Sequence, residues 1–507
     1  MGQYLMGIDN GLTVSKSAIF DLEGREVAVT VRKTETTYPH PGWTERDMEA
    51  LWRTTADAIR QAIVLAGIQA SEILAIGNSG HGNGLYPLDC EGRILRQGVA
   101  SMDTRASAIV DEWYATGVHE RVFPRTLQSL WPAQPPVLLA WLKRHEPDVY
   151  SRIGAALLCK DYIKYRLTGT LTTDFTDISG TSLLDAPNRC YSQQLLDDYG
   201  IGEMMAALPK PIWSHEVAGY VTRQAAEASG LAVGTPVVGG MFDVDAAPIA
   251  SGIVDEGTLG LVSGTWGINE VVTHKPIIDK NLFMTTLYAV PGLWLTIDGS
   301  ATSATNLEWF VTQFCGEERS AAAARGISVY DICNEIVAAL PGTDIIFHPF
   351  LYGSNVQVTA RAGFYGLAGW HTKAHVLRAL YEGVVFGHLA HVEKLRAAGA
   401  QIHAARFTGG GSHSLVWTQM FADALGLTIE VPDGSEVAAR GVAMAAGIAA
   451  GAYRDYAEAV QRSVRLARRH DPDPAKADYY RSRYAEYGCL AIAMSEPWDR
   501  LAHLALS

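Results

Sequence analysis

The chain has 507 residues, of which 41 are Lys or Arg and 54 are Asp or Glu, so its formal net charge is −13. An acidic chain repels phosphate backbones and anionic lipids, which argues against nucleic acid and the membrane surface as its partners. Hydrophobic residues make up 48% of the chain and charged residues 19%, a globular composition that excludes disorder as the dominant state. The length suggests about three units of roughly 150 residues, or two large ones.

The cysteine pattern and the N-terminal region indicate a reducing compartment. Six cysteines are spread along the chain without a Cys-x-x-Cys pair, which favours free thiols over a disulfide framework. The first residues carry no basic segment and reach Asp9 before any long apolar run, so they do not resemble a secretory signal. No stretch of about 18 apolar residues is present that could span a membrane. We therefore expect a cytoplasmic protein.

Strands and helices alternate along the chain. Residues 4–30 predict three strands, YLMGI, SKSAIFDL and EVAVT, joined by turns that contain glycine. A helix is predicted over residues 47–66, because apolar side chains recur on one stripe and Gly67 can end the helix. Residues 258–272 repeat the pattern of strand, glycine turn and strand, and residues 371–398 predict a second long helix. This alternation favours an α/β fold.

The two strand–turn–strand segments suggest two related lobes. We expect an N-terminal lobe over residues 1–246, a C-terminal lobe over residues 247–455 and a helical segment over residues 456–507 that packs on the lobes. The repeat is weak in sequence, and similar hairpin chemistry in both places would also explain it.

The first hairpin turn, DNGLTVSK, combines a carboxylate, a glycine and hydroxyl groups. Gly11 lets backbone approach a ligand, and the hydroxyls of Thr13 and Ser15 can donate hydrogen bonds to phosphate oxygens. Asp9 ends the preceding strand and is a candidate partner for Mg²⁺, which proteins usually hold with one or two carboxylates together with substrate phosphates. An ordinary hairpin turn is the alternative interpretation.

Two further glycine segments extend the phosphate hypothesis. Gly264 and Thr265 lie in a second hairpin turn, and the two turns could grip a polyphosphate from both sides of a cleft. Gly409, Gly410 and Gly411 stand between a predicted strand and a predicted helix, where bare backbone can accept a nucleotide. A tight crossover is the alternative for the three glycines. A GxxxxGK[ST] loop is absent from the sequence, which excludes a Walker-type site.

An acidic residue follows the strand PVVGG. Asp243 stands at the start of a predicted helix, where it could take a proton from a substrate hydroxyl, as phosphoryl transfer requires. The alternatives are that Asp243 only caps the helix, or that Asp245 carries the role.

Together these segments resemble the FGGY family of carbohydrate kinases over essentially the whole chain. The most specific motif is AGFYGL at 362–367, followed after seven residues by HVLRALYE at 375–382. Further segments match in order: PGWTERD at 41–47, SMDTRA with Asp103 and Arg105, KDYIKYRLTG at 160–169, GTPVVGG with Asp243, SGTWG, and TGGGSHSLVWTQMFAD at 408–423.

The resemblance implies a fold and a set of roles. The fold is α/β, with two ribonuclease-H-like lobes of the actin, sugar kinase and heat-shock ATPase type flanking a cleft. ATP and Mg²⁺ are the implied cofactors, with Asp9 as the metal-linked carboxylate and Asp243 as the general base in the sugar site. The implied ATP-binding residues are Gly11, Thr13, Ser15, Lys16, Gly264, Thr265, Gly409, Gly410, Gly411 and Gln419. The implied sugar-binding residues are His81, Gly82, Asn83, Asp103 and Arg105.

The variant motifs are similar to those of the L-xylulose kinase branch, which implies phosphorylation of a terminal hydroxyl on a small ketose, first of all a pentulose such as L-xylulose. D-xylulose, ribulose, glycerol and erythritol remain alternative substrates. His81 stands where a glutamine is common, and it could contact the sugar or pack behind the site. The expected partners are the sugar and ATP, and a homodimer is common in the family.

Three other functions are alternatives to a sugar kinase. An interaction protein like actin or a chaperone ATPase would turn over ATP without sugar. A pseudokinase would sense sugar without transferring phosphate, but Asp9, Thr13, Thr265 and Asp243 argue against it. A metal hydrolase could be built on His388 and His391, which share one helix, but no third ligand is evident in the sequence.

Overall fold

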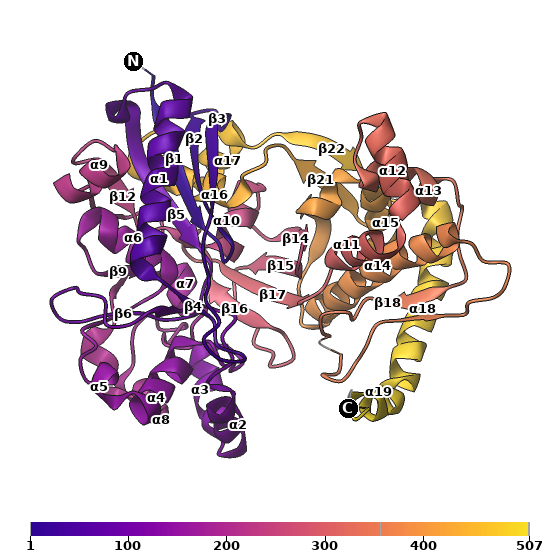
Figure 1. Ribbon diagram of the computed structural model, residues 1–507, viewed down its shortest axis with the longest axis horizontal. Helices are drawn as coiled ribbons and strands as arrows, with labels where there is room; N and C mark the ends of the chain where they lie inside the picture. Colours follow the sequence, from indigo (N-terminus) through magenta and orange to yellow (C-terminus); the bar gives the residue numbers. More distant parts are fainter. Residues whose placement is uncertain (1, 355, 505–507) are drawn as a thin grey trace. The chain divides into compact units, whose positions relative to one another are not determined.

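A computed structural model describes residues 2–354 and 356–504, and these fold into two compact units (Figure 1). The first unit comprises Met1–Asp255, Val272–Leu295 and Gly434–Val464. The second comprises Glu256–Val271, Thr296–Asp433 and Arg465–Ser507. Each unit contains a mixed sheet with helices packed against it, which confirms the predicted α/β class with two sheet-containing parts. Residues 505–507 of the expected C-terminal segment lie outside the described residues.

The first sheet has the strand order β11-β12-β5-β1-β2-β3, and β13 also pairs with β5. Its strands are β1 (Tyr4–Asn10), β2 (Val14–Asp21), β3 (Glu26–Lys33), β5 (Ile73–Gly80), β11 (Val217–Tyr220), β12 (Pro236–Val238) and β13 (Met241–Phe242). The β1–β2 pair is antiparallel, and β5 runs parallel to β1, β12 and β13. The carboxyl ends of β1, β5 and β13 therefore meet at one edge of the sheet.

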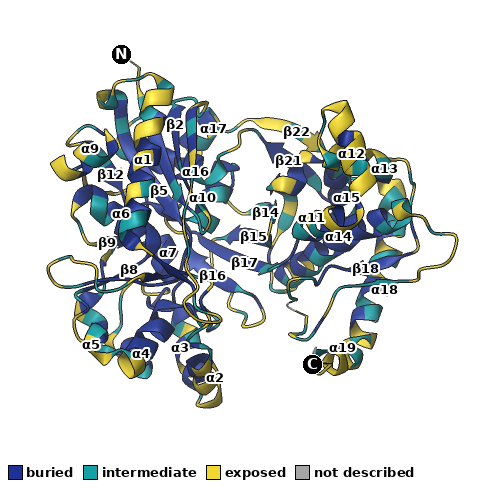
Figure 2. Ribbon diagram, in the orientation of Figure 1, coloured by how far each residue is buried: buried dark blue, intermediate teal, exposed yellow. Residues whose placement is uncertain are grey.

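Helices cover both faces of the first sheet. Helix α1 (Met48–Ala66) packs on β2 and β3 and shares a core with the alternate β1 residues Met6 and Ile8. Helix α16 (Val437–Ala449) lies on the opposite face, so close that a Cβ at Gly7 would come within 1.9 Å of the Ala439 carbonyl oxygen. In Figure 2 the central strands β1 and β5 are dark blue along most of their length, as expected for strands covered on both faces.

The rest of the first unit is mostly helical. Helix α6 (Cys159–Thr168) packs on β5, and α10 (Asp243–Ala250) packs on α16. A separate apolar core joins a group of short elements. These are α2 (Ser107–Ala115), α3 (Val118–Thr126), α4 (Pro135–His145), α5 (Pro147–Tyr150), α7 (Phe175–Ser179), α8 (Gln193–Asp198), β7 (Gly98–Val99), β8 (Ala155–Leu157) and β16 (Met284–Leu287). The unit has four more short strands, β4 (Glu45–Arg46), β6 (Tyr86–Leu88), β9 (Thr172–Asp174) and β10 (Lys210–Ile212). Helices α9 (Arg223–Ser229) and α17 (Tyr456–Ser463) also belong to this unit.

The sheet of the second unit follows the order β17-β15-β14-β20-β21-β22. Its strands are β14 (Gly257–Ser263), β15 (Gly267–Thr273), β17 (Trp294–Ser300), β20 (Ile402–Thr408), β21 (Thr428–Pro432) and β22 (Leu466–His470). The pairing from β15 to β22 is antiparallel, parallel, parallel and antiparallel, and the pairing from β2 through β1, β5 and β12 to β11 has the same sequence of directions. The two hairpin turns thus occupy equivalent places in two copies of one topology.

The helices of the second unit are α11 (Thr305–Phe314), α12 (Gly316–Arg325), α13 (Val329–Ala338), α14 (Lys373–Ala397), α15 (Leu415–Leu425), α18 (Ala477–Ala493) and α19 (Ser495–Ala502), and β18 (Ile346–His348) pairs with β19 (Gly363–Tyr365). Helix α14 lies within the range 371–398 predicted from the sequence. Among the described residues, no helix is both long and apolar enough to cross a membrane.

The predicted helix ends are also confirmed at α1. The Asp47 side chain accepts a hydrogen bond from Ala50 N, and Gly67 ends the helix with a φ of 65°, a conformation that favours glycine. The lobe limits expected from the sequence stay a prediction. Helix α16 falls within the range expected for the C-terminal lobe, but it belongs to the first unit because it packs on β1 and β5.

Candidate functional site

Two carboxylates lie at neighbouring strand ends in the first unit. Asp9 is opposite Ser79 in the parallel β1–β5 pair, and Met241 is opposite the same Ser79 in the β13–β5 pair. Asp243 follows β13 directly as the first residue of α10. The site therefore lies at the carboxyl edge of a parallel sheet region, where ligands of α/β proteins usually bind.

Burial gives both carboxylates unusual pKa values. Burial raises the pKa of Asp9 to about 6, a rise that the Lys16 ammonium opposes and Glu436 reinforces. Burial, and after it the negative charge of Asp9, raise the pKa of Asp243 to about 7. One buried oxygen of each carboxylate, Oδ1, has no hydrogen-bond partner among the described residues. A carboxylate with a pKa near neutrality is suited to general-base chemistry, and orphan carboxylate oxygens fit a divalent cation.

Buried side chains form hydrogen bonds with the segment that leads into Asp243. Lys164 Nζ donates a 2.9 Å hydrogen bond to the Gly239 carbonyl oxygen. The Phe242 amide donates to Thr176 Oγ1 at 2.9 Å, and the Thr176 hydroxyl donates to Asp174 Oδ2 at 2.6 Å. The backbone that leads into Asp243 is therefore held at Gly239 and at Phe242.

These contacts end in a completely buried cluster of charges. Lys160 Nζ lies 2.7 Å from both Asp161 Oδ1 and Asp174 Oδ1, and 3.5 Å from Asp177 Oδ2. Lys164 Nζ lies 3.0 Å from Asp161 Oδ1. Burial would lower the pKa of Lys160, but the three surrounding carboxylates outweigh it and raise that pKa. Burial also raises the pKa of Asp177 well above its usual value, which favours the neutral form of this carboxyl.

The predicted sugar loop, residues 80–84, packs against the same segment. A Cβ at Gly82 would come within 2.3 Å of the Phe242 ring, so only glycine permits this approach. Asn83 has a φ of 60°, in the left-handed region, and its side chain is buried. The loop and the base candidate are thus neighbours in space.

His81 lies in this loop with both ring nitrogens engaged. Its Nδ1 donates to the Gly82 carbonyl oxygen at 3.3 Å, so its Nε2 accepts from the Tyr86 hydroxyl at 3.1 Å. Burial, and then the charge of Arg46, lower the pKa of His81 to about 3, which keeps the ring neutral. The contact of His81 with a sugar stays a prediction.

Asp103 and Arg105 form hydrogen bonds and an ion pair with each other. Asp103 Oδ1 accepts from Arg105 N and Nε, and its Oδ2 accepts from Arg105 Nη2 and from the Thr44 amide. The Arg105 guanidinium also pairs with Glu45 at 2.9 Å and lies 4.0 Å from the centre of the Trp43 ring. Both side chains are fully buried, so their expected contact with a sugar stays a prediction that would require these bonds to rearrange.

In the first hairpin turn, Thr13 is exposed and Ser15 is not. The buried Ser15 Oγ accepts from Asn10 Nδ2 at 2.9 Å, so it bonds inside the sheet. Lys16 forms a 2.9 Å ion pair with Glu436. A Cβ at Gly11 would meet no atom closer than the Val14 carbonyl oxygen at 3.5 Å, an ordinary contact, so the packing of the turn leaves room there.

The glycines of the second unit fall into two kinds. Gly264 and Gly410 also have open space at their Cβ positions, so the packing of the chain does not require glycine there. Bare backbone at these positions fits a ligand that approaches closely. Gly409 has a φ of 83°, and Cβ atoms at Gly409 and Gly411 would both come within 2.7 Å of Ser263. These two glycines are needed to bring the glycine loop against the end of β14.

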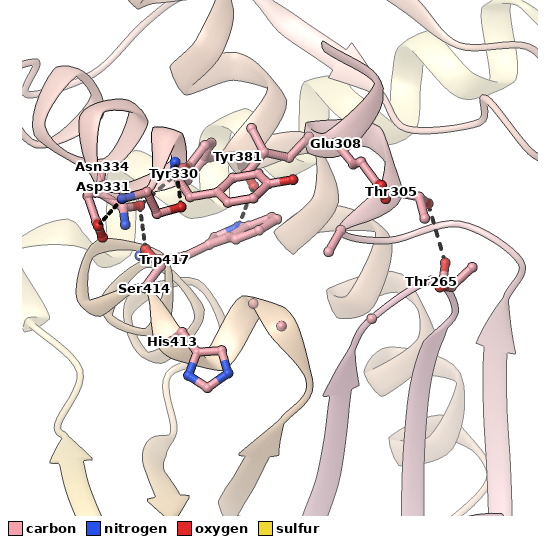
Figure 3. A pocket seen from close by; sticks show the side chains of 16 residues that line it. Thr265, Thr305, Glu308, Tyr330, Asp331, Asn334, Tyr381, His413, Ser414 and Trp417 are labelled. Atoms are coloured by element: carbon pink, nitrogen blue, oxygen red, sulfur yellow. Dashed lines mark hydrogen bonds between the residues drawn. The ribbon is translucent and has the colours of Figure 1, made fainter. Parts of the chain in front are cut away.

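A cavity of about 440 Å³ opens beside these glycines within the second unit. Figure 3 shows the side chains of Tyr330, Tyr381 and Trp417 gathered on one side of it and Thr265 on the other. Asn334 Oδ1 accepts from the Ser414 hydroxyl at 2.7 Å and from the Tyr381 hydroxyl at 3.1 Å, which leaves its amide as a hydrogen-bond donor. Aromatic faces together with a fixed amide suit a planar, polar ring such as a nucleobase.

The sequence interpretation missed several residues of this cavity. Tyr330 and Asn334 lie on α13, far along the chain from the glycine loop, and no local motif marked them. Trp417 belongs to the motif at 408–423, but the motif did not indicate a role for it. Gln419 is absent from the lining of this cavity, because its amide bonds to Asp423 Oδ1 and to the Asp471 carbonyl.

His388 and His391 are packing residues in α14. His388 bonds to Ser303 at 2.8 Å and to Asn269 at 2.9 Å, and His391 lies 2.7 Å from Asp298. Within the described part of the chain, no group of three or more His, Cys, Asp or Glu side chains is arranged to hold a metal ion. The two histidines are thus engaged by Ser303, Asn269 and Asp298, and the hydrolase alternative gains no third ligand in the described part of the chain.

Comparison with known proteins adds a family assignment. Residues 4–250 match the N-terminal domain of the FGGY family of carbohydrate kinases, and residues 259–450 match its C-terminal domain. The chain is 39% identical to an L-xylulose/3-keto-L-gulonate kinase of Escherichia coli (strain K12), over 97% of this chain and 98% of that protein. It is 30% identical to an autoinducer-2 kinase of Salmonella typhimurium, over 94% of this chain and 92% of that protein. The crystal structure of xylulose kinase from Rhodospirillum rubrum superposes with a TM-score of 0.88 at 27% identity, covering 98% of this chain and all of that one.

Proposed function

The chain belongs to the FGGY family of carbohydrate kinases, and we propose that it transfers the terminal phosphoryl group of ATP to a terminal hydroxyl of a small ketose, with L-xylulose as the leading substrate. As a family member it is an ATP-dependent sugar phosphotransferase. The observation that carries the proposal is Asp243, a carboxylate with an orphan oxygen and a pKa raised to about 7, beside the loop 80–84.

In this proposal Asp243 accepts the proton of the attacking hydroxyl. Oδ1 is free for that hydrogen bond, and a pKa near neutrality lets the carboxylate take the proton and release it again. The bonds of Lys164 and Thr176 to the backbone before Asp243 hold the base in place without reorganisation during the reaction. Phosphoryl transfer depends mainly on such positioning, because its transition state is loose.

The nucleotide is assigned to two places. The adenine ring fits the cavity at Tyr330, Asn334 and Trp417, and the glycine loop lets the sugar and phosphates lie against bare backbone. The hydroxyls of Thr13 and Thr265, one in each hairpin turn, are the proposed donors to the phosphates. Mg²⁺ would fit the orphan oxygen of Asp9, where it would neutralise phosphate charge.

The two basic side chains predicted to contact the sugar, His81 and Arg105, favour a neutral sugar over a sugar acid. Arg105 is neutralised by Asp103 and Glu45, and His81 is neutral, so neither offers an uncompensated cation to a sugar carboxylate. This supports L-xylulose over the 3-keto-L-gulonate that the Escherichia coli relative is also named for.

The test is a panel of acceptors in an assay that couples ADP release to NADH oxidation. L-xylulose, D-xylulose, L-ribulose, D-ribulose, glycerol, erythritol and 3-keto-L-gulonate are compared by kcat/KM, and ³¹P NMR identifies the phosphorylated position. We expect the highest kcat/KM for L-xylulose and a phosphomonoester at a terminal carbon. ADP release that does not depend on any acceptor, or a preference for the sugar acid, would contradict the proposal.

A further inference from the structure

Arg46 is a buried cation without an ion-pair partner among the described residues. Its side chain stands on the short strand β4 and is only 1% exposed, which is rare for arginine unless a carboxylate lies beside it. A buried guanidinium loses its hydration and normally requires a counter-charge. The question is which anion supplies that counter-charge.

The acids next to Arg46 in sequence are committed elsewhere. Glu45 projects to the opposite face of β4, as alternate strand residues do, and pairs with Arg96 and Arg105. Asp47 is exposed and caps α1 by accepting from Ala50 N. Neither carboxylate can neutralise Arg46 without giving up these bonds.

Arg46 instead holds the first hairpin turn. Nη1 donates to the Gly11 carbonyl oxygen at 3.2 Å, and Nη2 donates to the Leu12 carbonyl oxygen and, at 3.4 Å, to Thr34 Oγ1. All of these acceptors are uncharged. Of the remaining N–H groups, that of Nε is buried and has no hydrogen-bond partner among the described residues. The positive charge therefore lies directly behind Gly11 and Leu12, the residues that precede the exposed Thr13.

The other neighbours of Arg46 are also uncharged. The Tyr86 hydroxyl and the Cys159 thiol lie within hydrogen-bonding reach of the guanidinium. Burial raises the pKa of both groups far enough that each stays protonated near neutral pH. Tyr86 in turn donates to His81, which is neutral. The guanidinium is thus surrounded by neutral dipoles on the turn side and on the loop side.

We propose that Arg46 is a fixed electrostatic anchor behind the first hairpin turn, and that the terminal phosphates of the bound nucleotide supply the counter-charge that the chain does not. This inference rests on the proposed binding of phosphates at that turn. It makes Arg46 a positioning residue, which acts through the turn and through its charge. In a poorly hydrated site, a unit charge acting over several ångströms changes affinity by about tenfold or more.

Two pairs of variants separate the charge of Arg46 from its hydrogen bonds. Arg46→Gln removes the charge, and Arg46→Lys keeps it while losing the fork of donors. Cys159→Asp leaves Arg46 in place and sets a carboxylate beside it, and Cys159→Asn is the control with the same shape and no charge. Arg96→Gln is the matched arginine control, because Arg96 pairs with Glu45 and Glu146 and does not contact the turn.

The measurement is calorimetric binding of adenosine and of the non-hydrolysable analogue AMP-PNP, without divalent cation. The quantity compared is the phosphate increment, defined as the ratio of the adenosine Kd to the AMP-PNP Kd. We expect Arg46→Gln and Cys159→Asp to lower the increment about tenfold or more, with adenosine affinity unchanged. Arg46→Lys, Cys159→Asn and Arg96→Gln should keep the increment within about threefold of the wild type.

Three results would overturn the proposal. The increment could stay at the wild-type value in both Arg46→Gln and Cys159→Asp, it could fall equally in Cys159→Asp and Cys159→Asn, or adenosine affinity could fall as much as AMP-PNP affinity. If Arg46→Gln does not fold, the two Cys159 variants decide the question alone. Failure of the proposed function is seen separately, as absence of sugar-dependent ADP release in the wild type.

Discussion

Replacing Asp243 by Asn should abolish turnover and at the same time stabilise the protein at alkaline pH. Burial and the charge of Asp9 raise the pKa of this carboxyl from 3.8 to about 7. A group whose pKa is raised on folding contributes its full stability below the unfolded pKa and loses it as the pH rises through the folded pKa. The wild type therefore bears the cost of a buried charge at pH 8, and the amide does not.

The size of the effect follows from the shift. About three pKa units at 1.36 kcal/mol each give an upper limit of about 4 kcal/mol, and relaxation of the site reduces this to about 2–4 kcal/mol. Urea unfolding of the wild type and Asp243→Asn, without nucleotide or divalent cation, measures the difference at pH 8 and at pH 4.5. We expect Asp243→Asn to be more stable at pH 8 and the difference to shrink to about 1 kcal/mol at pH 4.5, where the folded carboxyl is neutral but the unfolded one, with a pKa of 3.8, is still largely ionised. An equal difference at both pH values, or a less stable variant at pH 8, would refute the reasoning.

Three other predictions follow from the site. kcat/KM for the ketose should fall about tenfold per pH unit below about pH 7, because protonated Asp243 cannot accept a proton, and a flat profile down to pH 5.5 would contradict this. Tyr330→Ala should raise the KM for ATP about fivefold and leave the KM for the sugar unchanged, because Tyr330 lines the cavity. The side chain is 40% exposed and lies outside the core, so the variant should still fold. An equal rise of both KM values would contradict the assignment of the cavity to the nucleotide. Thr176→Val removes the acceptor of the Phe242 amide and should lower kcat about tenfold with little change in either KM; an unchanged kcat would show that this bond does not position the base.

The parts of the fold that depend on local chemistry could be predicted from the sequence. The hairpins at 4–30 and 258–272 follow from alternating apolar residues and glycine turns, and α1 follows from its stripe and its two caps. Asp9 and Asp243 could be singled out because each stands at the end of an apolar strand. That these two carboxylates lie at neighbouring strand ends depends on how β1 and β13 align with β5, and the sequence does not show that register.

The remaining features depend on contacts between distant segments. Helix α16 packs on β1 through the close approach at Gly7, and no local sequence pattern predicts this contact. The cavity combines Tyr330 and Asn334 of α13 with Trp417 of α15. Ser15 was predicted to contact phosphate because its residue type fits, but alternation along β2 turns its hydroxyl into the sheet, where it accepts from Asn10.

The most direct test of Asp243 as the base compares Asp243→Asn with a change of the neighbouring carboxylate two residues along α10, Asp245→Asn. Single-turnover phosphorylation of L-xylulose is measured for both variants and the wild type, together with the Kd for AMP-PNP. We predict that Asp243→Asn loses about a thousandfold or more in the rate of phosphoryl transfer and keeps its nucleotide affinity, while Asp245→Asn keeps most of the rate. Full transfer in Asp243→Asn, or loss of transfer in Asp245→Asn alone, would contradict the assignment of Asp243 as the base.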